Sequence, residues 1–330
     1  MVAFNPSMQL RKFFINDVGR LRSGWRLLLF VCVFVALSFL VGLFLRIGYA
    51  LVHQFLPPVP HATFIANVIY RLTLLFSALG AGYFCTRVLE GLPWRALGLT
   101  FHTGWFRDLL VGSMLGIASL ALAAMIATAG GGLRFTMSGT GMLLLVGKSL
   151  VSTAVLFLVA ALAEEAMFRG YPLQTLTRAR LIWLGVLLTS VPFATAHLWN
   201  PNVVPGVTFA NTALAGVWLA VAYLRTRSLW FPLGVHWAWN WALGSLCGLP
   251  VSGVNLNGHP LLQGKDFGPA WLTGGSYGIE GGVACTIALL LSTLFIWRTN
   301  LVSPTPELKK LTSEENPAIP AAVVSIHRTP

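Results

Sequence analysis

Eight apolar runs, each about as long as the hydrocarbon core of a bilayer is thick, constrain the fold of this chain more than any other feature. A transmembrane helix needs about 20 predominantly apolar residues. These runs explain why 56% of the 330 residues are hydrophobic and only 10% are charged, with a mean hydropathy of +0.74. The sequence therefore predicts an all-α polytopic membrane protein with about eight transmembrane helices. The runs are 26–50, 62–86, 108–129, 142–163, 181–198, 207–224, 229–248 and 282–298.

Basic residues separate these runs and predict which side of the membrane each loop faces. The net charge of +12 is spread along the chain, so it does not indicate a nucleic-acid-binding protein. With the N-terminus inside, 17 Lys and Arg residues fall in inside segments, and two, Arg134 and Lys265, fall in outside loops. Because cytoplasmic loops carry an excess of Lys and Arg, we predict that both termini are cytoplasmic. The run 27–45 is too long for a signal peptide and is predicted to be a retained helix.

The segments outside these runs lead to two further expectations. The glycine-rich outer loop is either a cover over the helix bundle or a flexible connector, and the sequence leaves both open. The C-terminal tail has no apolar periodicity and is predicted to be disordered. In order, the parts are a cytoplasmic segment (1–25), three helices with their loops (26–142), a core (143–247), the outer loop (248–281), a last helix (282–298) and the cytoplasmic tail (299–330).

Two adjacent carboxylates, Glu164 and Glu165, end the fourth apolar run. An ionisable residue within a membrane span is a functional-site hypothesis by default. On a helix, Glu165 lies one turn before Arg169 and is predicted to pair with it. Glu164 points about 100° away, so it needs a partner from another segment or a role as a general base. The alternative is that both glutamates lie in a cytoplasmic loop, near Arg169 and Arg178. Pro172 should also kink or break a helix that continues from Glu164 to Arg178, which would place Glu164 closer to the cytoplasm.

Two further spans contain histidines. His197 lies near Trp199 at the end of the fifth run, where a lone histidine is usually an interfacial residue, so His197 by itself is a weak candidate. His236 and Asn240 are four residues apart within the seventh run, so they share one helical face. Because buried polar groups need hydrogen-bond partners, a ligand or a substrate oxygen is one candidate partner for this pair.

The three motifs together resemble those of the CPBP family, the CAAX-protease and bacteriocin-processing intramembrane endopeptidases that include the Rce1-type enzymes. The motifs are Glu164-Glu165-x-x-x-Arg169, Phe193-x-x-x-His197 and His236-x-x-x-Asn240, in the order found in the family, and the resemblance covers about 143–247. A Gly112-x-x-x-Gly116 helix also resembles the region that precedes this core.

The resemblance implies a role for each of these residues. Glu164 would activate a water molecule with help from His197, and His236 with Asn240 would stabilise the oxyanion. The remaining motif residues, Glu165, Arg169 and Phe193, would support them. The chemistry of the residues agrees, since peptide hydrolysis needs a base for water and donors aimed at the developing oxyanion. The resemblance thus predicts an intramembrane endopeptidase of the CAAX-protease type without a cofactor.

Three other functions stay open at this point. A zinc-dependent membrane metalloprotease would use His197, His236 and Glu164 as ligands, although no His-Glu-x-x-His helix is present. A non-catalytic scaffold or immunity protein would keep the fold without the chemistry. A proton-coupled transporter would use Glu164, His197 and Lys148, but the chain lacks the internal repeats typical of that class.

The expected partners and location follow from the leading interpretation. We expect a protein or peptide substrate, with membrane-anchored and prenylated substrates included, and a lipid bilayer around the protein. The short, compact chain favours a bacterial inner membrane over the endoplasmic reticulum.

Overall fold

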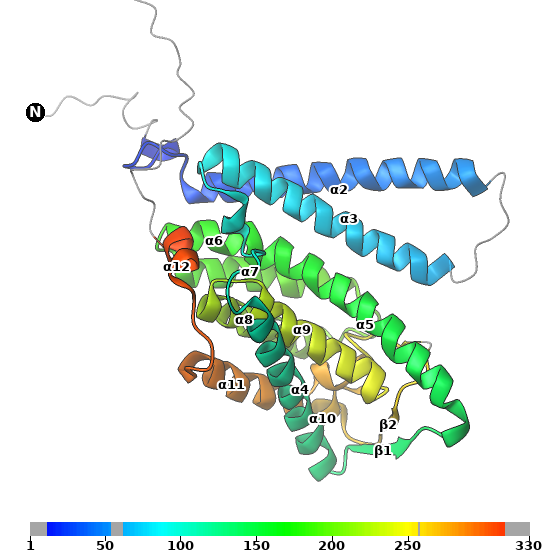
Figure 1. Cartoon of the computed structure of the whole chain (residues 1–330). Helices are drawn as coiled ribbons and strands as arrows, with labels where there is room; N and C mark the ends of the chain where they lie inside the picture. The colour runs from blue at the N-terminus through cyan, green and yellow to red at the C-terminus, as the bar shows by residue number, and fades with distance from the viewer. Residues whose placement is uncertain (1–11, 54–61, 257, 314–330) are drawn as a thin grey trace, which may run out of the picture.

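The computed structural model describes residues 12–53, 62–256 and 258–313 and is predominantly helical (Figure 1). In these residues, six helices are long and apolar enough to cross a membrane. Helices are present at all eight predicted positions, although the last two, which begin at Trp230 and Val283, are shorter. The protein is therefore a multi-pass integral membrane protein, as predicted. The six spans are Ser23–Leu51, Phe64–Leu89, Trp105–Ala129, Leu143–Arg178, Ile182–Trp199 and Val207–Thr226.

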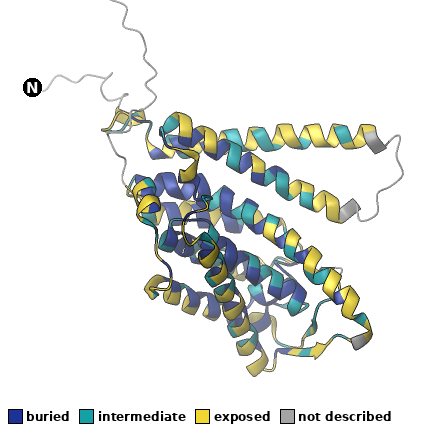
Figure 2. Cartoon of the chain, in the orientation of Figure 1, coloured by how far each residue is buried: buried dark blue, intermediate teal, exposed yellow. Residues whose placement is uncertain are grey.

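Two layers of helices are visible in Figure 1. Helices α2 and α3 lie together on one side of the molecule, and the helices from α4 onward pack around α8 and α9. Figure 2 shows α2 largely exposed and α8 and α9 largely buried. The helices are α2 (Ser23–His53), α3 (Ala62–Phe84), α4 (Trp105–Ala129), α5 (Leu143–Glu165), α6 (Tyr171–Arg178), α7 (Ile182–Ala196), α8 (Val207–Thr226), α9 (Trp230–Trp241), α10 (Ala270–Thr273), α11 (Val283–Arg298) and α12 (Pro306–Thr312).

The apolar side chains on the outer surface suit a lipid environment. On α2, Phe39 and Phe44 are 67% and 75% exposed. An exposed apolar surface of this extent is unusual in a soluble monomer, whereas side chains that face lipid tails lose nothing by being apolar. The buried core instead lies where α4, α8, α9 and α11 meet.

Helix α5 does not break at Pro172. A π-helical turn, Ala166–Gly170, joins α5 to α6, and Pro172 occupies the first turn of α6. Proline is tolerated in the first turn of a helix, because its missing N–H has no intrahelical acceptor there. The wider π turn thus keeps the chain helical from Leu143 to Arg178 and places both glutamates inside the helical span, not in a loop.

Glycines let α4 and α9 approach until their backbones touch. A methyl group on Gly112 would collide with the carbonyl oxygen of Phe231, and one on Gly116 would collide with that of Val235. Gly234 of α9 is packed in the same way against the carbonyl oxygen of Leu109. Small residues are enriched where membrane helices pack this closely. This contact fixes the position of α9, which bears His236 and Asn240.

A buried carboxylate connects α2, α3 and α6 at one end of the molecule. Glu90 follows the π-helical turn that ends α3, and its side chain is fully buried. It accepts hydrogen bonds from Arg26 at 2.6 Å, from Thr175 at 2.5 Å, and from Arg178. A buried charge is tolerated when it is paired and hydrogen-bonded in this way.

The segments predicted to face the cytoplasm gather at this same end. Arg107 donates to the carbonyl oxygen of Leu301, Arg225 donates to that of Thr299, and Arg95 pairs with Glu307 at 3.2 Å. These contacts place the predicted inside segments together. The side of the membrane on which they lie stays a prediction.

The outer loop and part of the tail have regular structure. Strand β2 (Leu262–Asp266) of the loop pairs antiparallel with β1 (Leu133–Met137), with Leu133 opposite Asp266. The expectation of a disordered tail is wrong for Pro306–Thr312, which forms α12 with an N-cap from Thr305 and a buried Leu308. The rest of the predicted tail, 314–330, lies outside the described residues.

Candidate active site

One cavity of about 260 Å³ contains all four residues predicted to be catalytic. Glu164 comes from the end of α5, His197 from the end of α7, and His236 and Asn240 from α9. The π turn after α5 and the α4–α9 contact help to bring these three chain segments to one cavity. The cavity also has an apolar wall, which includes Leu156, Phe157, Trp218, Leu219 and Leu289.

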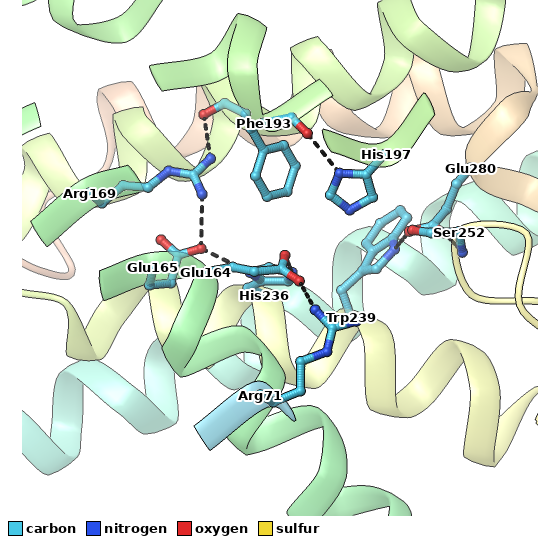
Figure 3. Close-up of polar contacts among 11 residues, drawn as sticks. Arg71, Glu164, Glu165, Arg169, Phe193, His197, His236, Trp239, Ser252 and Glu280 are labelled. Atoms are coloured by element: carbon cyan, nitrogen blue, oxygen red, sulfur yellow. Dashed lines mark hydrogen bonds and ion pairs between the residues drawn. The ribbon is translucent and has the colours of Figure 1, made fainter. Parts of the chain in front are cut away.

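Glu165 is the shared acceptor in a buried hydrogen-bond network that connects the end of α5 to α9 (Figure 3). Its Oε1 atom lies 3.2 Å from Arg169 Nη1, as the i,i+4 spacing predicted, and 2.8 Å from His236 Nδ1. The side chains of Glu165 and Arg169 are both fully buried. Arg169 also donates to the carbonyl oxygen of Gly216 and stacks on the ring of Phe193, with 4.6 Å between its Cζ and the ring centroid.

Glu164 has a partner from a different helix, as its position required. Its Oε1 atom accepts a hydrogen bond from Arg71 of α3 at 2.9 Å. Its Oε2 atom lies 3.6 Å from His236 Nε2. The carboxylate is 13% exposed and faces the cavity, so it is available to a small molecule that enters there.

His197 is oriented by the backbone of its own helix. Its Nδ1 atom lies 2.7 Å from the carbonyl oxygen of Phe193. A carbonyl oxygen only accepts, so Nδ1 is the donor and bears the proton. The neutral ring then leaves Nε2 as an acceptor, and His197 lines the cavity that contains Glu164. Phe193 supports this arrangement, since its ring contacts both His197 and Arg169.

His236 is oriented by a carboxylate instead of a backbone carbonyl. An ionised Glu165 only accepts, so His236 Nδ1 donates to it. Its Nε2 atom is aimed at Glu164 and at the cavity, and Asn240 lies one turn further along the same helix face. A protonated ring donates at both nitrogens, and the Asn240 amide offers a second donor.

The outer loop covers one side of the cavity. Glu280 accepts hydrogen bonds from Trp239 of α9 at 2.9 Å and from the backbone N–H of Ser252 at 2.5 Å (Figure 3). Glu280 and Ser252 both line the cavity. Burial raises the pKa of the neighbouring Tyr277 phenol to about 12, so this side chain stays neutral. Of the two interpretations left open by the sequence, the contacts favour a cover.

Two of these cavity residues were missed from the sequence. Arg71 lies within the second apolar run, where an ionisable residue is already a signal of function. Glu280 was placed in the outer loop with no role, and nothing in its spacing connects it to Trp239. Both lie far along the chain from the three motifs, so the helix spacing that paired the other residues did not apply to them.

The ligand set proposed for zinc does not converge. Within the part of the chain that the structure describes, no three His, Cys, Asp or Glu side chains form a group suited to a metal ion. His236 is hydrogen-bonded to Glu165 through Nδ1, and its Nε2 atom lies 3.6 Å from Glu164 Oε2. These residues as arranged do not fit a resident zinc ion, which would need three protein ligands around one point.

The fold and the site define a class of protein. This is a polytopic helical membrane protein with a carboxylate and histidine centre in a cavity between its helices.

Residues 145–242 match the family described as type II CAAX prenyl endopeptidase Rce1-like. The chain thus contains a domain of that family, which includes all the motif residues and lies within the predicted core, and this supports a membrane protease of the same family.

A second comparison gives one curated relative. An uncharacterized 24.3 kDa protein of Escherichia coli is 34% identical over 90 residues, which are 26% of this chain. The chain spans 40% of the length of that relative. No solved structure matches the chain.

Proposed function

We propose that the protein is an intramembrane endopeptidase that hydrolyses peptide bonds with a glutamate-activated water molecule. One observation supports this most directly. Glu164, His197, His236 and Asn240 line one cavity, although they come from three helices. We further propose that it acts in a bacterial inner membrane on protein or peptide substrates, with membrane-anchored and prenylated substrates included.

In this mechanism, Glu164 takes a proton from water while the His197 Nε2 atom accepts from the same water. The water oxygen attacks the scissile carbonyl carbon. In this mechanism the His236 ring is protonated, so that Nδ1 donates to Glu165 and Nε2 donates into the cavity. His236 Nε2–H and the Asn240 amide donate to the oxyanion that forms, a type of stabilisation whose loss costs about a hundredfold or more in rate per donor. The C–N bond then breaks, and Glu164 returns the proton to the leaving amine.

Glu165 and Arg169 act through His236. Because Glu165 accepts from Nδ1, it keeps the Nε2 atom of His236 directed at the cavity. Arg169 holds Glu165 in turn. These two residues are positioning residues and touch no substrate.

The test compares cells that contain the wild-type protein with cells that contain Glu164→Gln. Mass spectrometry of membrane-derived peptides should reveal cleavage products that only the wild type makes. Purified protein in detergent should also cleave members of a pooled library of internally quenched peptides, and Glu164→Gln should not. Identical peptide sets from the two strains would contradict the proposal.

Two alternatives have their own outcomes in these assays. Loss of cleavage after exhaustive chelation, with recovery on added zinc, would favour the metalloprotease. A scaffold or immunity protein would keep its biological role in both Glu164→Ala and His236→Ala variants.

A further inference from the structure

Arg71 reaches the catalytic carboxylate from outside the segment that matches the family. It belongs to α3, whereas the match covers 145–242. Of the described residues that line the cavity, Arg71 is the only Lys or Arg. Its Nη1 atom donates to Glu164 Oε1 at 2.9 Å. The positive charge of this arginine therefore lies beside the proposed reacting water.

The environment of Arg71 differs from that of the structural arginine at the same site. Arg169 is fully buried, donates to Glu165 and Gly216, and stacks on Phe193. The Arg71 side chain is 36% exposed, and in the described part of the chain its one hydrogen bond goes to Glu164. A guanidinium has five N–H donors in a planar fork. Arg71 is thus a partly exposed cation that has further N–H groups available to a ligand.

The resting geometry also conflicts with the proposed chemistry of Glu164. One of its oxygens accepts from Arg71 and the other faces His236, so both are directed at cationic or donor groups. A guanidinium bound to this carboxylate stabilises its ionised form, so the resting pair makes Glu164 a weaker base for the proton of a water molecule. A group that binds during the reaction and draws Arg71 away would make Glu164 a stronger base, and only a group that prefers the opened pair can shift Arg71 in this way.

From these observations we propose that Arg71 is a substrate-carboxylate receptor. In the free protein it pairs with Glu164, and on substrate binding it transfers to a carboxylate of the peptide, which frees Glu164 for water. This proposal rests on the proposed function. Arg is suited to the role, because its fork matches a carboxylate with two parallel hydrogen bonds. Asn67, one turn earlier on α3, lines the same cavity and offers a second donor.

A peptide offers this carboxylate from two sources, its C-terminus and an Asp or Glu side chain. The experiment uses three matched sets of internally quenched peptides: C-terminal acids, their C-terminal amides, and amides with an Asp or Glu within three residues after the cleaved bond. Wild-type protein should cleave one carboxylate-bearing set at least tenfold faster, in kcat/KM, than the plain amides.

Arg71→Gln should remove this preference to within about twofold, mainly by slowing the acid substrates. Arg71→Lys keeps the charge without the fork and should keep part of the preference. Arg46→Gln, an exposed arginine of α2 that does not line the cavity, is the matched control and should behave as wild type. If Arg71→Gln slows acids and amides equally, then Arg71 only orients Glu164 and the proposal is wrong.

A binding measurement checks the resting pair without turnover. Glu164→Gln removes the partner of Arg71, so it should bind the C-terminal-acid peptides about tenfold more tightly than wild type does, and the amides equally well. Equal binding of acids by both proteins would overturn the proposal. If the wild-type protein cleaves the acid and amide peptides at the same rate, this inference alone is contradicted. If it cleaves none of the peptides, the proposed function is contradicted as well.

Discussion

The Nδ1 atom of His236 lies 2.8 Å from Oε1 of Glu165, although the two residues are 71 positions apart in the chain. This hydrogen bond determines which ring nitrogen of His236 reaches the cavity. It also connects α9 to the end of α5 within the same site. A change at Glu165 should therefore alter both the stability of the helix packing and the reaction.

Glu165→Gln should lower kcat with little change in KM, because it disturbs the donor directed at the oxyanion but leaves the cavity wall intact. It should also reduce the free energy of unfolding by about 3 kcal/mol, the usual cost of breaking a buried pair from one side. Quenched-peptide kinetics and unfolding in detergent measure the two effects. Glu307→Gln, which removes an exposed pair with Arg95, is the control and should change neither.

Glu90→Gln should affect stability alone. Its carboxylate is fully buried and paired with Arg26 and Arg178, so the substitution breaks two buried ion pairs from one side and should cost about 3–5 kcal/mol. None of these three residues lines the cavity. At a temperature where the variant is still folded, kcat should equal that of the wild type. A selective loss of kcat would show that this end of the molecule is coupled to the reaction.

Gly112→Ala should reduce kcat, although it adds only one methyl group. The new methyl group meets the carbonyl oxygen of Phe231, so α9 must shift away from α4, and overpacking of this kind costs about 1–3 kcal/mol. Gly147→Ala is the matched control, because a methyl group on this α5 glycine meets no atom within 4 Å. We expect kcat to fall in the first variant only. Equal kinetics in both would mean that α9 does not need this contact.

Glu280→Ala should loosen the outer loop. The loss of hydrogen bonds to Trp239 and Ser252 removes its attachment to α9. Hydrogen exchange followed by mass spectrometry should show faster exchange in 249–282 and little change in α4 and α11. Asp266→Ala, which removes contacts within the loop to Gly268 and Thr273, is the comparison. If exchange in 249–256 is unchanged, Glu280 does not hold the cover.

Helix spacing explains which parts of the site were predictable. The pairing of Glu165 with Arg169 and the shared face of His236 and Asn240 are properties of single helices, so the sequence was sufficient. Arg71 and Glu164 are 93 positions apart and lie on different helices, so their contact depends on how α3 packs on α5. Likewise, the effect of Pro172 depended on whether the turn before it could widen, which periodicity does not reveal.

The same distinction applies to the fold. The eight apolar runs predicted the helices because length and hydropathy decide what can cross a bilayer. They did not predict α12, since its short helix depends on a cap from Thr305 and on burial of Leu308 against other segments. Local signals of this size become informative only once the neighbouring segments are in position.

The direct backbone contact between α4 and α9 has a mechanical consequence. Where side chains separate two helices, a small displacement is absorbed when the side chains change rotamer. At Gly112 and Gly116 there are no such side chains, so a displacement of α4 is transmitted directly to the backbone of α9. His236 and Asn240 would then move as a rigid unit. The direct contact between these two backbones therefore couples the position of the proposed oxyanion donors to any bending or change in thickness of the surrounding bilayer.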